Sequence, residues 1–167
     1  KINLATPAGP VGPQGPPGPA GGATELNDLN DVKYDGSSLF VGEGVGINDD
    51  AGASDGFLND NTGIGKDALR NNTSGHGNTA NGYQTLYSNI TGHSNTANGI
   101  GALYSNTTGY SNTASGSKTL FKNTTGKWNT AVGFDALYWN TTGYSNTANG
   151  KTALHNNTTG YRNTAVG

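Results

Sequence analysis

A block of seventeen residues repeats along most of this chain, and no other feature restricts its fold so strongly. Complete blocks begin at an asparagine at residues 61, 78, 95, 112, 129 and 146, and another block begins at Asn163. They share the pattern N-T-A-x-G-x-x-[AT]-L-x-x-N-T-T-G-x-x with few departures. A short fixed period is typical of solenoids, in which each repeat packs only on its neighbours. We number the positions of each block 1 to 17 from its first asparagine.

The composition also favours a fold that needs little core. Leu, Ile, Val and Phe account for 26 of the 167 residues, a share that by itself would indicate disorder. The formal net charge is only -2, however, whereas disordered chains combine low hydrophobicity with high charge. Stacked coils resolve this conflict, because backbone ladders between coils replace much of the apolar burial.

Positions that stay the same from block to block separate the expected interior from the expected surface. Leucine at position 9 and alanine at position 3 recur in the blocks, so we expect both to point inward. So thin a core predicts a flattened coil of two short strands. Glycine at positions 5 and 15 predicts two bends with positive φ. Asparagine at positions 1 and 12 predicts ladders of amide hydrogen bonds between coils about 4.8 Å apart.

The segment 9–22 has the Gly-X-Y sequence pattern of collagen. Glycine occupies every third place from Gly9 to Gly21, and proline follows four of these five glycines. Three polyproline II strands can wind together only where each third residue lacks a side chain, so the segment predicts a short triple helix. A Gly/Pro linker is the alternative. The residues expected to form the trimer are Gly9, Gly12, Gly15, Gly18, Gly21, Leu26, Leu29 and Val32.

The chain therefore divides into five parts. Residues 1–8 form an N-terminal arm, 9–22 the collagen-like triple helix, and 23–37 a neck and hairpin. Leu26, Leu29 and Val32 give the neck one apolar edge, and a turn signal at 35–38 separates two strand-like runs. Residues 38–60 form an atypical capping coil with an insertion, and 61–167 form the regular β-solenoid.

Aromatic residues are the best candidates for contacts with a partner. They fall into two rows, one at position 10 with a tryptophan beside it and one at position 16, so flat rings should lie one coil apart. Such rows can stack on sugars or on a partner surface, or they can seal the seams between chains. The candidate residues are Tyr87, Tyr104, Phe121, Tyr138 and Trp139 for the first row, and Tyr110, Tyr144 and Tyr161 for the second.

Several classes of protein fit the sequence poorly. The histidines His76, His93 and His155 have no cysteine partner and no nucleophile-elbow serine, so we expect neither an enzyme nor a metal or cofactor site. Charge is sparse and mixed, which argues against nucleic acid as a partner. No apolar run approaches the roughly 20 residues that span a bilayer.

The collagen-like run, the segment Glu25–Val32, the run Leu39–Gly42 and the N-T-A-x-G-x-x-A-L repeats together resemble bacterial and phage trimeric fibre proteins. They are also similar to the heads of trimeric autotransporter adhesins, whose coils are shorter. The resemblance implies an all-β homotrimer of parallel β-solenoids with about 17 residues per coil, preceded by the triple helix. It also implies an extracellular, cell-surface or virion appendage with a structural or adhesive role.

Two further hypotheses follow from the residues. The threonines at position 2 give a regular column of hydroxyls, so the chain is alternatively a glycan- or ice-binding solenoid. The trimers can also polymerise end to end if the first residues add as a strand to the last coil of another trimer. The expected partners are thus the chain itself and cell-surface glycans.

Overall fold

The structure is a computed structural model that describes residues 32–34, 38–46 and 60–167. The predicted arm at 1–8, the collagen-like segment 9–22, most of the neck, and most of the insertion in the capping coil lie outside these residues. So do the trimer-forming candidates from Gly9 to Gly21, Leu26 and Leu29. Val32 belongs to the first strand.

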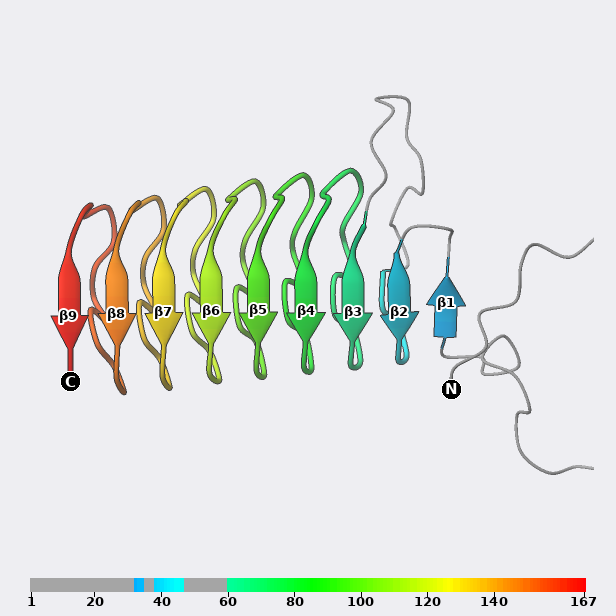
Figure 1. The fold of residues 1–167 in the computed structure, drawn as a ribbon, viewed down its shortest axis with the longest axis horizontal. Coiled ribbons are helices and arrows are strands. Elements are labelled where there is room, and N and C mark those ends of the chain that lie inside the picture. Colours follow the sequence, from blue (N-terminus) through cyan, green and yellow to red (C-terminus); the bar gives the residue numbers. More distant parts are fainter. Residues whose placement is uncertain (1–31, 35–37, 47–59) are drawn as a thin grey trace, which may run out of the picture.

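The described residues form one parallel β-solenoid without a helix, as the repeat predicts. Nine three-residue strands lie side by side in chain order, one per coil after the first (Figure 1). Neighbouring strands pair seventeen residues apart from β3 onward, as in Thr79↔Thr96. The strands are β1 (Val32–Tyr34), β2 (Leu39–Val41), β3 (Thr62–Ile64), β4 (Thr79–Asn81), β5 (Thr96–Asn98), β6 (Thr113–Ser115), β7 (Thr130–Val132), β8 (Thr147–Asn149) and β9 (Thr164–Val166).

The first strand is the exception to the parallel order. β1 pairs antiparallel with β2, which confirms the pairing expected for the hairpin. β2 then pairs parallel with β3, with Leu39 opposite Thr62, so residue 38 occupies position 1 of the first coil. The hairpin strand therefore covers the outer edge of the first coil, and the backbone of β2 has a partner on both sides.

Each coil has one strand rather than the two that the sequence analysis expects. The path from position 6 to position 12 is a series of turns, because non-glycine residues adopt positive φ at positions 7 and 9, as Gln84 (54°) and Leu86 (51°) do. A left-handed residue at every second place interrupts an extended strand. The turns are still laddered to the next coil, since the Leu86 N–H donates to the Ala102 carbonyl at 3.0 Å.

The two glycine positions have different physical causes. Position 5 has φ between 116° and 137° in every coil, as predicted. The prediction of positive φ at position 15 is wrong. There a side chain is excluded by crowding, since a Cβ on Gly109 would lie 2.2 Å from Asn106 Oδ1 and 2.5 Å from the Gly126 carbonyl oxygen. Glycine at position 15 lets the asparagine side chains and the backbone of the next coil pack directly against this part of the chain.

The interior consists of the leucine, alanine and asparagine columns. The leucines from Leu69 to Leu137 and the alanines from Ala80 to Ala131 are fully buried. The asparagine ladders are also confirmed. Asn95 Nδ2 donates to Asn78 Oδ1 of the previous coil and to the Gly109 carbonyl of its own coil.

The first coil departs from the repeat, but its core is still closely packed. Phe40 takes the place of the alanine at position 3, and the leucine of position 9 is replaced by Gly46. A Cβ on Gly46 would lie 2.6 Å from the Phe40 ring, and one on Gly63 would lie 2.8 Å from it. Two glycines thus compensate for one large ring, which preserves the volume of the core.

Candidate interaction surfaces

The aromatic residues at position 10 form one continuous stack along the solenoid. Tyr87, Tyr104, Phe121, Tyr138 and His155 follow one another with ring centroids 4.9–5.3 Å apart and interplanar angles of 5–13°. The spacing is close to that between strands, because each ring projects from the same place in successive coils. The structure thus places four of the predicted site residues in a single row and adds His155 to it.

A second row lies at position 16 and is interrupted once. His76, His93 and Tyr110 stack with centroids 4.9 and 4.8 Å apart, and Tyr144 stacks on Tyr161 at 5.0 Å and 2°. Lys127 occupies this position in the coil between the two groups. The row therefore contains the three predicted tyrosines in two separate stacks.

Stacking restricts what these rings can bind. An inner ring such as Tyr104 has a ring on each side, so both of its faces are covered and only its edge is directed outward. Sugars bind to aromatic side chains through the ring face. The inner members of both rows are therefore poorly suited to that role and instead join one coil to the next.

Two tryptophans lie across the rows rather than within them. Trp128 is 50% exposed and edge-on to Tyr110, and Trp139 is 44% exposed and at 67° to Tyr138. Each has a lysine beside it. Lys127 Nζ lies 4.7 Å from the centroid of Trp128, and Lys122 Nζ lies 5.8 Å from that of Trp139. Sequence reasoning found Trp139 but missed Trp128, whose position next to the row was the available signal.

Threonine hydroxyls are used differently in different columns. At position 13, Thr107 donates to the Thr124 carbonyl, and at position 8, Thr119 donates to that of Gly133. At position 2 the threonines of β4 to β8 are exposed, and their hydroxyls form no intramolecular hydrogen bond within the described residues. The outer face of the sheet therefore keeps its hydroxyls free.

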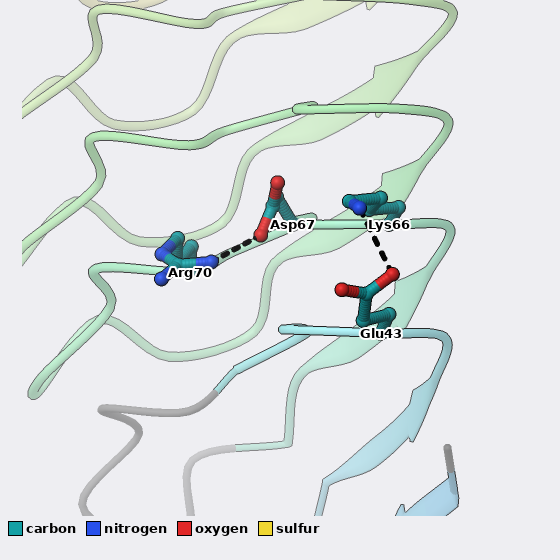
Figure 2. Close-up of polar contacts among 4 residues, drawn as sticks. All are labelled: Glu43, Lys66, Asp67 and Arg70. Atoms are coloured by element: carbon teal, nitrogen blue, oxygen red, sulfur yellow. Dashed lines mark hydrogen bonds and ion pairs between the residues drawn. The ribbon is translucent and has the colours of Figure 1, made fainter.

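Charged pairs occur where the first two coils meet (Figure 2). Lys66 Nζ lies 2.9 Å from Glu43 Oε2 of the preceding coil, and Arg70 pairs with Asp67 within its own coil. The hydrogen bond to Glu43 raises the pKa of Lys66, and the one to Asp67 raises that of Arg70. Both side chains of the Lys66–Glu43 pair are exposed, so this pair contributes little to stability, whereas Arg70 is half-buried and its partner Asp67 is buried.

His93 lies in the second row, beside His76. Partial burial lowers its pKa from the ordinary value of 6.5, and the neighbouring His76 lowers it further. In the described ranges, no three His, Asp or Glu side chains gather closely enough to hold a metal ion. The same residues include no helix long and apolar enough to cross a membrane.

Comparisons with protein-family models, curated proteins and solved structures find no match to this chain.

Proposed function

We propose that this chain is the subunit of an extracellular structural and adhesive fibre, in which three parallel copies form a rigid rod. The observation that carries the proposal is the unbroken stack of coils from residue 61 to 167, in which each coil is joined to the next by backbone bonds, asparagine ladders and ring stacks. No hinge separates the coils, so we expect such a stack to be stiff and to transmit load along its axis. The collagen-like spelling at 9–22 supports three chains.

The mass of the protein in solution tests the proposal. Light scattering after size exclusion should give about 51 kDa, three times the 17.0 kDa of one chain. A mass of one chain would contradict the homotrimer and leave an isolated solenoid. Larger filaments that disappear when residues 1–8 are deleted would support end-to-end assembly of trimers.

The exposed tryptophans favour a second candidate function, which is glycan binding at the surface of the rod. Trp128 and Trp139 present ring surface that is not taken up by the two stacks, and the adjacent Lys127 and Lys122 can pair with acidic sugars. The proposed ligand is therefore a carboxylated saccharide on a cell surface.

A glycan array with wild-type protein and the variant Trp128→Ala/Trp139→Ala tests this function. The variant should lose binding to acidic glycans, while Ile90→Ala, which removes a similarly exposed apolar side chain elsewhere, should retain it. Equal binding by all three proteins would exclude the tryptophans as the site.

A further inference from the structure

The outward face of the sheet carries no charge along its whole length from β2 to β9. In each strand the middle residue points inward and the two flanking residues point outward, as the exposed–buried–exposed pattern of β4 shows. The sixteen flanking residues are seven threonines, three asparagines, one serine, three valines, one leucine and one isoleucine. A sheet face that meets water ordinarily carries charged side chains. Depletion of charge is instead typical of the centre of an interface.

Exposed apolar side chains gather on this face and at its edge. Ten large hydrophobic residues of the described chain are exposed, and six of them lie at positions 4 and 6, on either side of the glycine that bends the chain at the end of each strand. Ile100 and Phe134 are 57% and 46% exposed. The six residues are Ile64, Tyr83, Ile100, Val132, Phe134 and Val166. We call Tyr83, Ile100 and Phe134 at position 6 the apolar ridge; the same position carries Glu43, Lys66, Ser117 and Lys151 in the other coils.

The repeat restricts what can cover the face. Its threonine column is the same in seven coils, so a partner that meets each threonine alike must repeat at the strand spacing of about 4.8 Å. A parallel copy of this chain has that period, because its coils have the same spacing. The collagen-like segment ahead of the solenoid points to the same partner, because a triple helix aligns three chains in parallel and places their solenoids side by side.

We infer that the outward face of β2–β9 and its apolar ridge form the chain-to-chain seam of the solenoid, with the sheets of three parallel copies turned toward a common axis. This inference rests on the proposed homotrimer and assigns its contact surface. The threonine hydroxyls, which have no partner in residues 32–34, 38–46 and 60–167, donate and accept between copies, while the ridge of each copy packs on the next. The aromatic rows, whose rings are already stacked within the chain, remain on the outside of the rod.

Two triple variants of the full chain test the seam. Thr96→Glu/Thr113→Glu/Thr130→Glu places three carboxylates on the sheet face, and Thr108→Glu/Thr125→Glu/Thr142→Glu places them at position 14 of the same three coils. All six threonines are exposed, and none of their hydroxyls forms a hydrogen bond among the described residues, so both variants should keep the circular dichroism spectrum of the wild type. The face variant should fall threefold in mass, to one chain, whereas the position 14 variant should keep the mass of three.

Cross-linking gives a positive signal for the same surface. The chain contains no cysteine, so Thr113→Cys and Thr125→Cys each introduce a single thiol. A short bis-maleimide should join Thr113→Cys chains into a two-chain band on a denaturing gel and leave Thr125→Cys chains separate.

The outcomes separate the two proposals. A wild-type mass of one chain overturns the homotrimer, and with it the seam. If that monomer also shows thermal hysteresis that the face variant lacks, the face binds ice. A wild-type mass of three that persists in the face variant, or that is lost equally in both triple variants, overturns the seam and leaves the homotrimer standing. Equal cross-linking at both cysteines also overturns the seam.

Discussion

The asparagine columns inside the solenoid and the ring columns outside it stack in the same register but by different means. Inside, every complete block has asparagine at both positions, and Asn106 Nδ2 donates to Asn89 Oδ1 at 2.8 Å and to the Gly109 carbonyl at 2.9 Å. Outside, tyrosine, phenylalanine and histidine exchange freely, yet neighbouring rings stay 4.8–5.3 Å apart.

The difference shows what each kind of contact requires. A ladder of amides needs a donor and an acceptor at the same height in every coil, because a buried polar atom without a partner costs about 1–3 kcal/mol. A stack of rings needs only a flat surface at that height. Repeated interior contacts therefore keep the residue constant, whereas repeated exterior contacts preserve its shape.

The substitution Asn106→Ala should break the inner ladder and give the largest effect. It removes two donated bonds and the one accepted from Asn123, and it leaves buried polar atoms unpaired in two neighbouring coils. We expect a loss of about 4 kcal/mol in the free energy of unfolding. Chemical denaturation measures it, with Thr108→Ala in the same coil as a control that stays within about 0.5 kcal/mol. Equal midpoints would mean that the ladder contributes nothing.

A second substitution, Gly109→Ala, separates crowding from backbone conformation. The new Cβ would meet the amide of Asn106 and the next carbonyl, so we expect a loss of about 3 kcal/mol. Gly77 is the matched control, because it has φ of 61° but open space around its Cα, and serine adopts the same conformation at this position in Ser94. Gly77→Ser should therefore cost less than about 1 kcal/mol. The reverse order in thermal unfolding would refute the crowding explanation.

The outer row should tolerate a change of residue but not the loss of a ring. Tyr104→Phe keeps both stacked contacts and should leave stability within about 0.5 kcal/mol of the wild type, as Phe121 in the same column suggests. Tyr104→Ser loses both and should cost about 1–2 kcal/mol. Similar unfolding curves for the phenylalanine and serine variants would show that the stack is not stabilising.

The smallest expected effect is the pH dependence of stability that arises from the stacked pair His76 and His93. The pKa of His93 is lower in the folded chain than the ordinary 6.5, so the folded state is disfavoured when this group takes up a proton. Its stabilising contribution is complete above pH 6.5 and is lost as the pH falls through the lowered value. The melting temperature should decline below pH 6.5 more steeply in the wild type than in His93→Tyr. This variant has at position 16 the same residue type as the next coil, where Tyr110 lies. Identical slopes would assign the acid sensitivity to other groups.

Sequence reasoning identified the solenoid, its period and the inward direction of Leu103 and Ala97, because periodicity reports directly which residues share an environment. It failed where one residue type has two uses. Nothing in the letters distinguishes Gly99, which needs positive φ, from Gly109, which needs space. Leucine also gives no signal that it will adopt a left-handed conformation, so the second strand was predicted where the chain turns. The uncharged sheet face depends on which residues of each three-residue strand point outward, and the repeat pattern alone does not show this.

The left-handed leucines have a consequence for how the solenoid folds. A non-glycine residue in this conformation costs roughly 1–2 kcal/mol, and the same cost recurs at position 9 of every complete block. The backbone hydrogen bond to the neighbouring coil offsets part of this cost, as the bond from Leu86 to Ala102 does. We therefore expect a single coil to be unstable on its own and each further coil to gain stability from a neighbour that is already folded. We expect the solenoid to fold by templated extension from a group of folded coils, in the way that a crystal grows by adding layers.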